Sequence, residues 1–304
     1  MARPRGAAPK ATCKAAPVDL VLGTGRFAPT DRVVMAVVNR TPDSFYDKGA
    51  AYATDAALDL VDRHVAGGAA ILDVGGVKAG PGDEVDEREE LRRTAAFVTE
   101  VRGRYPDVVI SVDTWRASVA RELVACGADL INDTWAGHDP ELAGVAADTG
   151  AGLVCAHTGG ATPRTRPHRV AYDDVVADVI RTTLALAERA QAEGVRPDGI
   201  LIDPTHDFGK NTRHSLLLTR RLDELVATGW PVLVALSRKD FVGETLDLPP
   251  ADRLEGTLAA TAISAWHGAR VFRAHDAAAT RRVLDMVSSI LGERDPAVGR
   301  RGLA

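Results

Sequence analysis

The chain has 304 residues, 45% of them hydrophobic, and a formal net charge of −5. This length fits one α/β barrel of roughly 250 residues with extensions at its ends. The negative charge excludes a whole-chain attraction to nucleic acid or to an anionic membrane, so we expect no nucleic-acid or membrane partner. No apolar run reaches the roughly 18 residues of a membrane-spanning helix.

The first segment, residues 1–30, places basic residues among Ala, Pro and Gly and lacks the continuous apolar core of a signal peptide. We therefore expect a flexible N-terminal extension over residues 1–30, a barrel domain over 31–292 and a C-terminal tail over 293–304. The three cysteines show no metal-binding or redox spacing, which indicates reduced thiols and a cytoplasmic protein.

Eight short apolar runs recur along the chain, and we expect each to form a parallel strand buried on both faces. The runs are residues 33–38, 70–74, 108–112, 129–131, 152–156, 199–202, 231–236 and 269–272. Segments with helical periodicity occupy residues 54–66, 87–102, 116–126, 139–148, 172–193, 212–228, 251–267 and 277–291. Strand and helix alternating eight times predict an α/β fold of the (β/α)8 TIM-barrel type.

Polar residues stand at or just past the ends of these runs, where a (β/α)8 barrel carries its active site. They are Asn39, Asp73, Asp113, Asn132, His157, Asp203, Ser237 with Lys239, and Arg273 with His275. Each has a structural alternative, such as capping a helix, closing a turn or ending a strand. For His157 the structural role is the favoured interpretation. For the others, their placement at one barrel mouth favours function.

Four stretches carry a more specific pattern. They are Asn39-Arg40-Thr41-Pro42-Asp43-Ser44-Phe45-Tyr46-Asp47; Ser111-Val112-Asp113-Thr114 with Ile131-Asn132-Asp133; Asp203-Pro204 with Phe208-Gly209-Lys210; and Ser237-Arg238-Lys239 with Arg273-Ala274-His275-Asp276. In this order, over residues 33–286, they resemble dihydropteroate synthase, the pterin-binding transferase of folate biosynthesis. Members of that family condense 6-hydroxymethyl-7,8-dihydropterin pyrophosphate with p-aminobenzoate and release pyrophosphate.

The resemblance implies a role for each matching residue. Pterin binding would fall to Asp113, Asn132, Asp203 and Lys239. Pyrophosphate binding would fall to Asn39, Arg273 and His275, with Asn39 also a ligand of Mg²⁺. Phe208 would lie on the acceptor side, near the p-aminobenzoate ring. The resemblance also implies a homodimer.

Residue chemistry supports these roles independently. Carboxylates and Asn satisfy the donors of a pterin edge, and Lys239 satisfies its carbonyl. Catalysis would rest on Asp113, Lys239, Arg273 and His275. Asp113 would stabilise the cation-like methylene that forms as pyrophosphate leaves. Arg273, His275 and a metal ion would stabilise the leaving group. A dissociative ionisation of this kind needs no protein nucleophile.

One loop departs from the family. Where the family reads Asp-x-Gly-Gly-Glu-Ser-Thr-Arg-Pro-Gly, residues 73–82 read DVGGVKAGPG, so Val77-Lys78-Ala79-Gly80 replaces Glu-Ser-Thr-Arg. Gly80 has no side chain, and Lys78 on the acceptor side restores charge without a planar bidentate fork. Losing such a contact costs on the order of 10²-fold in rate. We therefore predict that the standard activity is weak or lost.

Other substitutions touch the same mouth. Thr205-His206-Asp207 replaces the family's Gly-Ile-Gly, and Ala235 replaces a Gly before the Ser-Arg-Lys motif. Arg40 and Lys48 add positive charge to the first loop. Three hypotheses remain: a pterin-binding paralogue with little activity, an active synthase, or a transferase for another acceptor, including a more anionic one met by Arg40, Lys48 and Lys78. The related methyltetrahydrofolate–corrinoid methyltransferases share the barrel, but the pyrophosphate-side pair at 273 and 275 argues against them.

Overall fold

The computed structural model describes residues 19–41, 54–165 and 170–302. Eight parallel strands form one sheet in the order β8-β7-β6-β5-β4-β3-β10-β9. Their bounds are β3 Val33–Asn39, β4 Ile71–Gly75, β5 Val109–Asp113, β6 Leu130–Asp133, β7 Gly152–Ala156, β8 Ile200–Asp203, β9 Leu233–Ala235 and β10 Val271–Ala274. A parallel bridge between Ile202 and Val232 joins the two edges, so the sheet closes into the predicted TIM barrel.

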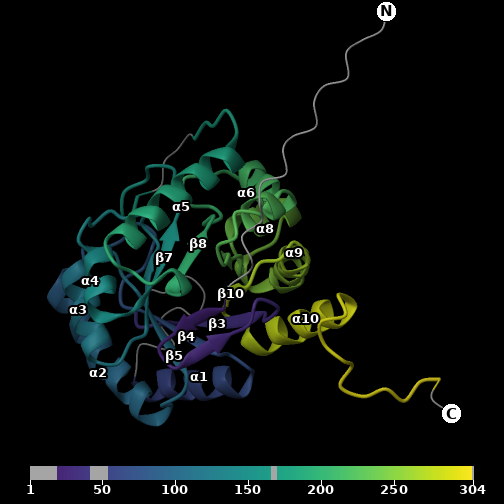
Figure 1. Cartoon of the computed structure of the whole chain (residues 1–304), viewed down its shortest axis with the longest axis horizontal. Coiled ribbons are helices and arrows are strands. Elements are labelled where there is room, and N and C mark those ends of the chain that lie inside the picture. Colours follow the sequence, from purple (N-terminus) through teal and green to yellow (C-terminus); the bar gives the residue numbers. More distant parts are fainter. Residues whose placement is uncertain (1–18, 42–53, 166–169, 303–304) are drawn as a thin grey trace, which may run out of the picture.

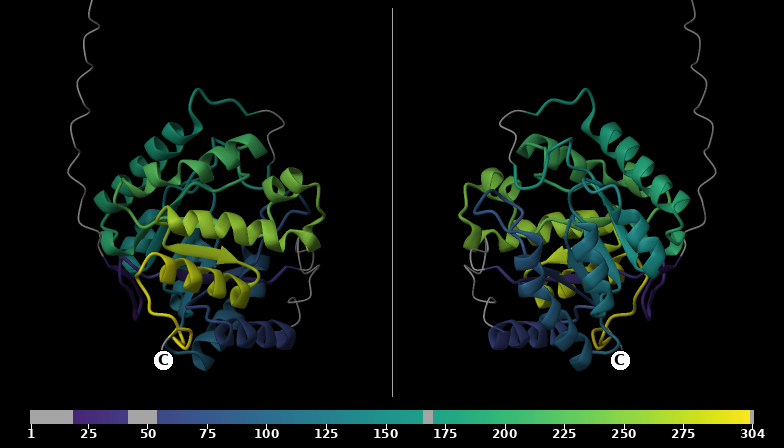
Figure 2. Two further views of the ribbon diagram at one scale, coloured as in Figure 1. Left: turned by 90° about the vertical axis from the view of Figure 1, so that its right-hand side faces the viewer. Right: turned by 90° about the vertical axis from the view of Figure 1, so that its left-hand side faces the viewer.

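Helices surround the strands on the outside of the barrel (Figure 1). Their bounds are α1 Thr54–Ala66, α2 Glu87–Arg104, α3 Ala117–Ala125, α4 Leu142–Thr149, α5 Val175–Ala192, α6 Thr212–Arg220, α7 Leu222–Val226, α8 Asp240–Leu246, α9 Leu254–Trp266 and α10 Ala277–Ile290. Two short 3-10 turns, η1 Pro197–Gly199 and η2 Pro250–Asp252, precede β8 and α9. Figure 2 shows α9 and α10 lying side by side across β10.

Alternate strand residues build two apolar layers, because successive side chains point to opposite faces of a strand. One layer fills the barrel interior and includes Met35, Ile71 and Leu130, all fully buried. The other packs the outer strand faces against the helices. A hairpin of β1 Leu20–Leu22 and β2 Gly25–Phe27 adds Leu20 and Leu22 to the inner layer. The apolar layer inside the barrel therefore includes residues of this hairpin as well as residues of the eight strands.

Several elements differ from the sequence prediction. The hairpin lies within the segment expected to be a flexible extension; strands of three residues are too short for a periodicity to reveal them. The helix predicted over 212–228 is two helices, because Arg221 leaves the helical conformation at φ −110°. Helix α8 was not predicted. Among the residues described, no helix combines the length and apolarity needed to cross a membrane.

Candidate active site

A cavity of about 410 Å³ opens at the carboxyl ends of the strands. It is lined by every residue predicted for the site: Asn39, Lys78, Asp113, Asn132, Asp203, Phe208, Lys239, Arg273 and His275. They come from β3, β5, β6, β8 and β10 and from the loops that follow β4, β8, β9 and β10. The fold therefore brings these residues to one cavity, while their individual roles stay predictions.

Asp73, which the sequence analysis placed at the barrel mouth without a binding or catalytic role, organises the floor beneath this cavity. Its carboxylate is completely buried and accepts hydrogen bonds from Ser111 Oγ at 2.6 Å and Asn132 Nδ2 at 3.2 Å. Arg273 Nε donates to the same carboxylate at 2.6 Å. Asp73 thus fixes the orientation of Asn132 and Arg273.

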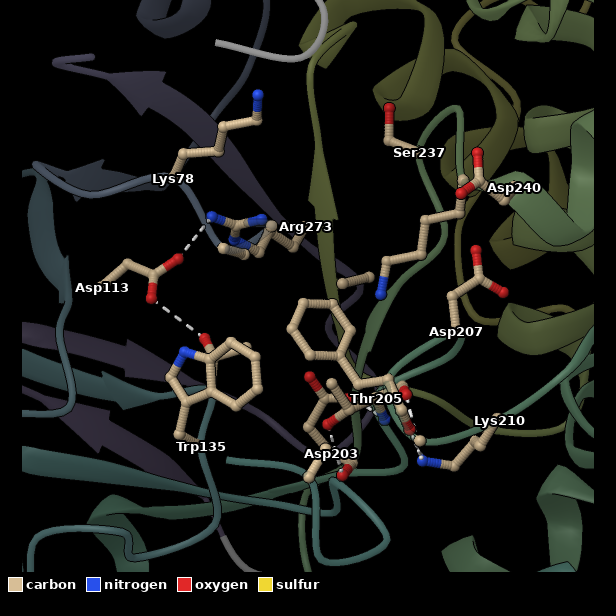
Figure 3. A pocket seen from close by; sticks show the side chains of 18 of the residues that line it. Lys78, Asp113, Trp135, Asp203, Thr205, Asp207, Lys210, Ser237, Asp240 and Arg273 are labelled. Atoms are coloured by element: carbon tan, nitrogen blue, oxygen red, sulfur yellow. Dashed lines mark hydrogen bonds and ion pairs between the residues drawn. The ribbon is translucent and has the colours of Figure 1, made fainter. Parts of the chain in front are cut away.

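Asp113 lies at the end of β5, next to Arg273 (Figure 3). Its Oδ2 atom is 2.9 Å from Arg273 Nη2, and its Oδ1 accepts from Thr134 Oγ1 at 3.0 Å. Burial raises the pKa of Asp113 to about 7, and the neighbouring Asp73 charge adds to this against the opposing charge of Arg273. Its side chain is still 19% exposed, so a ligand in the cavity can reach it.

Two lysines stand near Asp203 with different surroundings. Lys210 Nζ donates to the carbonyls of His157, Thr205 and Phe208 at 2.9–3.1 Å, and burial lowers its pKa to about 7. Lys210 therefore stabilises the loop after β8. Lys239 Nζ donates to the His206 carbonyl at 2.6 Å and lies 4.9 Å from the centre of the Phe208 ring.

Two aromatic residues that follow β6 and β8, Trp135 and Phe208, form an aromatic wall of the cavity. The Phe208 and Trp135 rings meet edge to face with centroids 5.2 Å apart, and both residues line the cavity. Trp135 also meets Trp115 edge to face at 6.4 Å. This wall offers the apolar surface that an aryl ring needs. Phe208 was predicted for it, whereas Trp135 was not.

His275 is a neutral hydrogen-bonding residue. Burial lowers its pKa to about 3, helped by the charges of Arg273 and Arg238. Its Nδ1 lies 2.9 Å from Ser237 Oγ, which also accepts from the His275 backbone N–H at 3.2 Å. The two contacts with Ser237 fix the orientation of the imidazole ring. His275 therefore presents a neutral imidazole to the cavity.

Arginines hold the rewritten loop after β4. Arg93 Nη1 donates to the Gly76 carbonyl at 3.0 Å, and Arg116 Nη2 donates to the Val85 carbonyl at 2.7 Å. From the loop after β7, Arg164 reaches the Gly80 carbonyl at 3.5 Å and also donates to the Asp83 carbonyl. Between these arginine contacts, the Lys78-Ala79-Gly80 stretch lines the cavity. The loop is thus tied at both ends and in its middle.

Arg40 lies behind the cavity lining, between two residues that belong to it, Asn39 and Thr41. It is 6% exposed; its guanidinium donates to the Arg93 carbonyl and Thr54 Oγ1 and lies over the Phe97 ring at 4.6 Å. A cation beside an aromatic face and a carbonyl stabilises the start of α1 against α2. Lys48 and the rest of the first motif lie outside the described residues.

His157 is buried outside the cavity lining. Its Nε2 lies 2.8 Å from Asp178 Oδ2, and burial lowers its pKa to about 4. This contact ties β7 to α5, as expected for a structural histidine.

Oxygen ligands converge above Gly75. A Cβ atom placed there would lie 3.9 Å from Asn39 Oδ1 and 4.0 Å from Asp113 Oδ2, so the missing side chain leaves a space bordered by two oxygens. Mg²⁺ prefers oxygen ligands and keeps part of its shell from water or phosphate. Within the described part of the chain, no group of three or more His, Cys, Asp or Glu is placed to hold a metal. Asn39 Oδ1 and Asp113 Oδ2 are oxygens of the type that Mg²⁺ accepts, so the donor chemistry of these two residues fits such an ion.

Comparison with known proteins agrees with this geometry. Residues 35–275 match the family model of the pterin binding enzymes. The chain is 61% identical over 285 residues to a Mycobacterium tuberculosis H37Rv protein named inactive dihydropteroate synthase 2, covering 92% of this chain and 90% of that one. A Yersinia pestis dihydropteroate synthase, solved in a sulfonamide drug complex, superposes with a TM-score of 0.86 at 36% identity, covering 90% of this chain and 100% of that one.

A dihydropteroate synthase of Thermus thermophilus, solved in complex with 4-aminobenzoate, gives a TM-score of 0.80 at 35% identity and covers 90% of this chain and 100% of that one. The chain belongs to the pterin-binding enzyme family of folate synthesis. Within that family it is a divergent paralogue of dihydropteroate synthase.

Proposed function

We propose that this protein binds 6-hydroxymethyl-7,8-dihydropterin pyrophosphate and has little or no dihydropteroate synthase activity. The main support for this proposal is that the cavity keeps the residues expected to bind the pterin but has lost the acceptor-loop sequence. The side chains expected to bind the pterin, Asp113, Asn132, Asp203 and Lys239, converge on it, whereas the acceptor loop has lost its Glu-Ser-Thr-Arg sequence. The name of the Mycobacterium tuberculosis relative supports the same conclusion.

Binding of the pterin ring would come first, because the Arg273 guanidinium must leave Asp113 before it can bind the pyrophosphate. Arg273 uses Nε and Nη2 to bind Asp73 and Asp113. A pterin that occupies Asp113 with its own donors would release Nη2 toward the pyrophosphate. The neutral imidazole of His275 would face the same group. Asn39 would hold Mg²⁺, and the ion would supply positive charge next to the leaving group.

The acceptor would lack its guanidinium contact. Gly80 provides no side chain, and the guanidinium of Arg164 donates to the Gly80 and Asp83 carbonyls. Lys78 supplies a point charge without the planar fork of an arginine. A synthase that cannot complete this contact would transfer the pterin at least about 10²-fold more slowly.

Restoring the loop tests this proposal. The triple variant Lys78→Ser, Ala79→Thr and Gly80→Arg returns the family sequence at the three positions. We expect p-aminobenzoate-dependent pyrophosphate release to rise at least tenfold while pterin affinity stays unchanged. Gly82→Arg adds the same side chain to the same loop outside the cavity lining and serves as the matched control. No gain in the triple variant, with pterin binding intact, would mean that the loop is not the cause.

We also propose a homodimer, as the family resemblance implies. The outer sides of α9 and α10 leave Ile263, Trp266, Met286 and Ile290 between 48% and 62% exposed. A second copy placed on these adjacent helices would cover this apolar surface. Sedimentation velocity tests the proposal: we expect a dimer that Trp266→Glu with Met286→Glu converts to a monomer. A wild-type monomer at micromolar concentration would contradict it. A cytoplasmic location agrees with free Cys126 and Cys155.

A further inference from the structure

The turn that follows β6 carries a hydroxyl group that reaches Asp113 at the end of the neighbouring strand β5. Thr134 lines the cavity, and its Oγ1 atom donates to Asp113 Oδ1 at 3.0 Å. The other carboxylate oxygen, Oδ2, lies 2.9 Å from Arg273 Nη2. Both oxygens of Asp113 thus have a partner, and the two partners come from different elements, the turn after β6 and strand β10.

The local backbone holds Thr134 in place. The Thr134 backbone N–H donates to the Asn132 carbonyl at 3.1 Å. The buried carboxylate of Asp133 accepts from the Trp135 backbone N–H at 3.0 Å, which fixes the chain on the other side of Thr134. Thr134 is also β-branched, so its side chain has a restricted choice of χ1 rotamers. The turn itself, independently of a ligand, therefore holds the hydroxyl against Asp113.

The two partners of Asp113 would behave differently in the proposed pterin complex. Arg273 would leave Oδ2, because the pterin donors take its place and the guanidinium binds the pyrophosphate. Thr134 would stay on Oδ1, because its position depends on the turn and not on the ligand. The terminal torsion of an aspartate is broad by itself, so the Thr134 hydrogen bond would limit rotation of the carboxylate. Oδ2 would then face the pterin without a further cost in conformational entropy.

The same hydrogen bond favours the charged form of Asp113. Burial raises the pKa of this carboxyl, and the charge of Arg273 and the hydrogen bond from Thr134 oppose the rise. A hydrogen bond donated to a carboxylate stabilises its ionised form. Once Arg273 has moved to the pyrophosphate, Thr134 would continue to favour the carboxylate, which is the form that accepts from the pterin donors.

Resting on the proposed pterin site, we infer that Thr134 is a positioning residue for the pterin: its hydroxyl holds the Asp113 carboxylate in the orientation that accepts the donors of the ring. Thr134 acts through Asp113. The turn that carries it also places Trp135 in the cavity lining, and Figure 3 shows Asp113 and Trp135 on the same side of the cavity. The turn after β6 would therefore serve both the pterin side and the aromatic wall.

Calorimetric titration of the full-length protein with 6-hydroxymethyl-7,8-dihydropterin tests this inference. Thr134→Val keeps the shape of the side chain and removes the hydroxyl, so we expect the pterin to bind about tenfold more weakly. Thr134→Ser keeps the hydroxyl and should bind within about threefold of the wild type. Thr149→Val makes the same change at an exposed residue of α4 whose hydroxyl donates to the Val145 carbonyl. This control should leave the affinity unchanged.

A second pair of variants tests whether Thr134 acts through Asp113. Asp113→Ala has no carboxylate to orient, so adding Thr134→Val to it should change the remaining affinity by less than about twofold. If Asp113→Ala does not fold, the comparison of Thr134→Val with Thr134→Ser decides the inference by itself.

Three results would overturn the inference: Thr134→Val binds the pterin as tightly as the wild type, Thr134→Ser binds no better than Thr134→Val, or the effect of Thr134→Val is undiminished in Asp113→Ala. The wild-type titration separates this inference from the proposed function. Wild-type protein that binds no pterin would refute the proposed function and this inference with it. Wild-type binding that Thr134→Val leaves unchanged would refute this inference alone.

Discussion

The affinity of this protein for a pterin should rise with pH through neutrality, because Asp113 must be ionised to accept hydrogen bonds from the pterin donors. Its folded-state pKa is about 7, raised chiefly by burial. A carboxyl with this pKa is about 10% ionised at pH 6 and about 90% ionised at pH 8. The affinity should therefore increase about tenfold between these two values.

Calorimetry in buffers of different ionisation enthalpy checks this directly. Since pterin donors favour the carboxylate, binding at pH 7 should release a fraction of a proton from Asp113. Asp113→Asn should bind more weakly and lose both the proton release and the slope. Quenching of Trp135, which lines the cavity, gives an independent affinity. A flat or falling wild-type profile, or an unchanged slope in Asp113→Asn, would refute the reasoning.

Three further variants test the buried and loop contacts that hold the site residues in place. Asp73→Asn removes the buried counter-charge of Arg273 and should lower the free energy of unfolding by about 3 kcal/mol in urea denaturation; a loss below about 1 kcal/mol would contradict the floor described. Lys210→Met leaves three carbonyls without their donor and should lower it by a similar amount, about 3 kcal/mol, whereas an unchanged urea midpoint would contradict its role. Arg164→Ala should speed hydrogen exchange in residues 79–85 while global unfolding changes by less than about 0.5 kcal/mol; unchanged exchange would mean that Arg164 does not hold the loop.

The barrel itself was readable from the sequence because each strand is a short apolar run buried on both faces. Strand β7 and helix α1 have the predicted bounds, and the other strands differ by a few residues at their ends. What periodicity missed is short: the hairpin β1–β2 and helix α8. Their position depends on contacts with distant segments, such as Leu20 and Leu22 within the barrel interior.

The site was predicted less completely than the fold. The residues expected to bind pterin and pyrophosphate follow strands, so the barrel alone brings them together. Side-chain direction was not readable: Arg40 turns toward Phe97, and Asp73 is buried beneath Arg273. The cavity lining also includes a loop residue, Asp207, and two residues of the missed helix α8, Asp240 and Glu244. Only the folded chain places these side by side.

Pyrophosphate release from hydroxymethyl-dihydropterin pyrophosphate with Mg²⁺, measured with and without p-aminobenzoate in protein shown to bind the pterin, is the most direct test of the central claim. The account predicts tight pterin binding and no release that depends on p-aminobenzoate. Release that depends on p-aminobenzoate, at a rate comparable to an active dihydropteroate synthase under the same conditions, would contradict it.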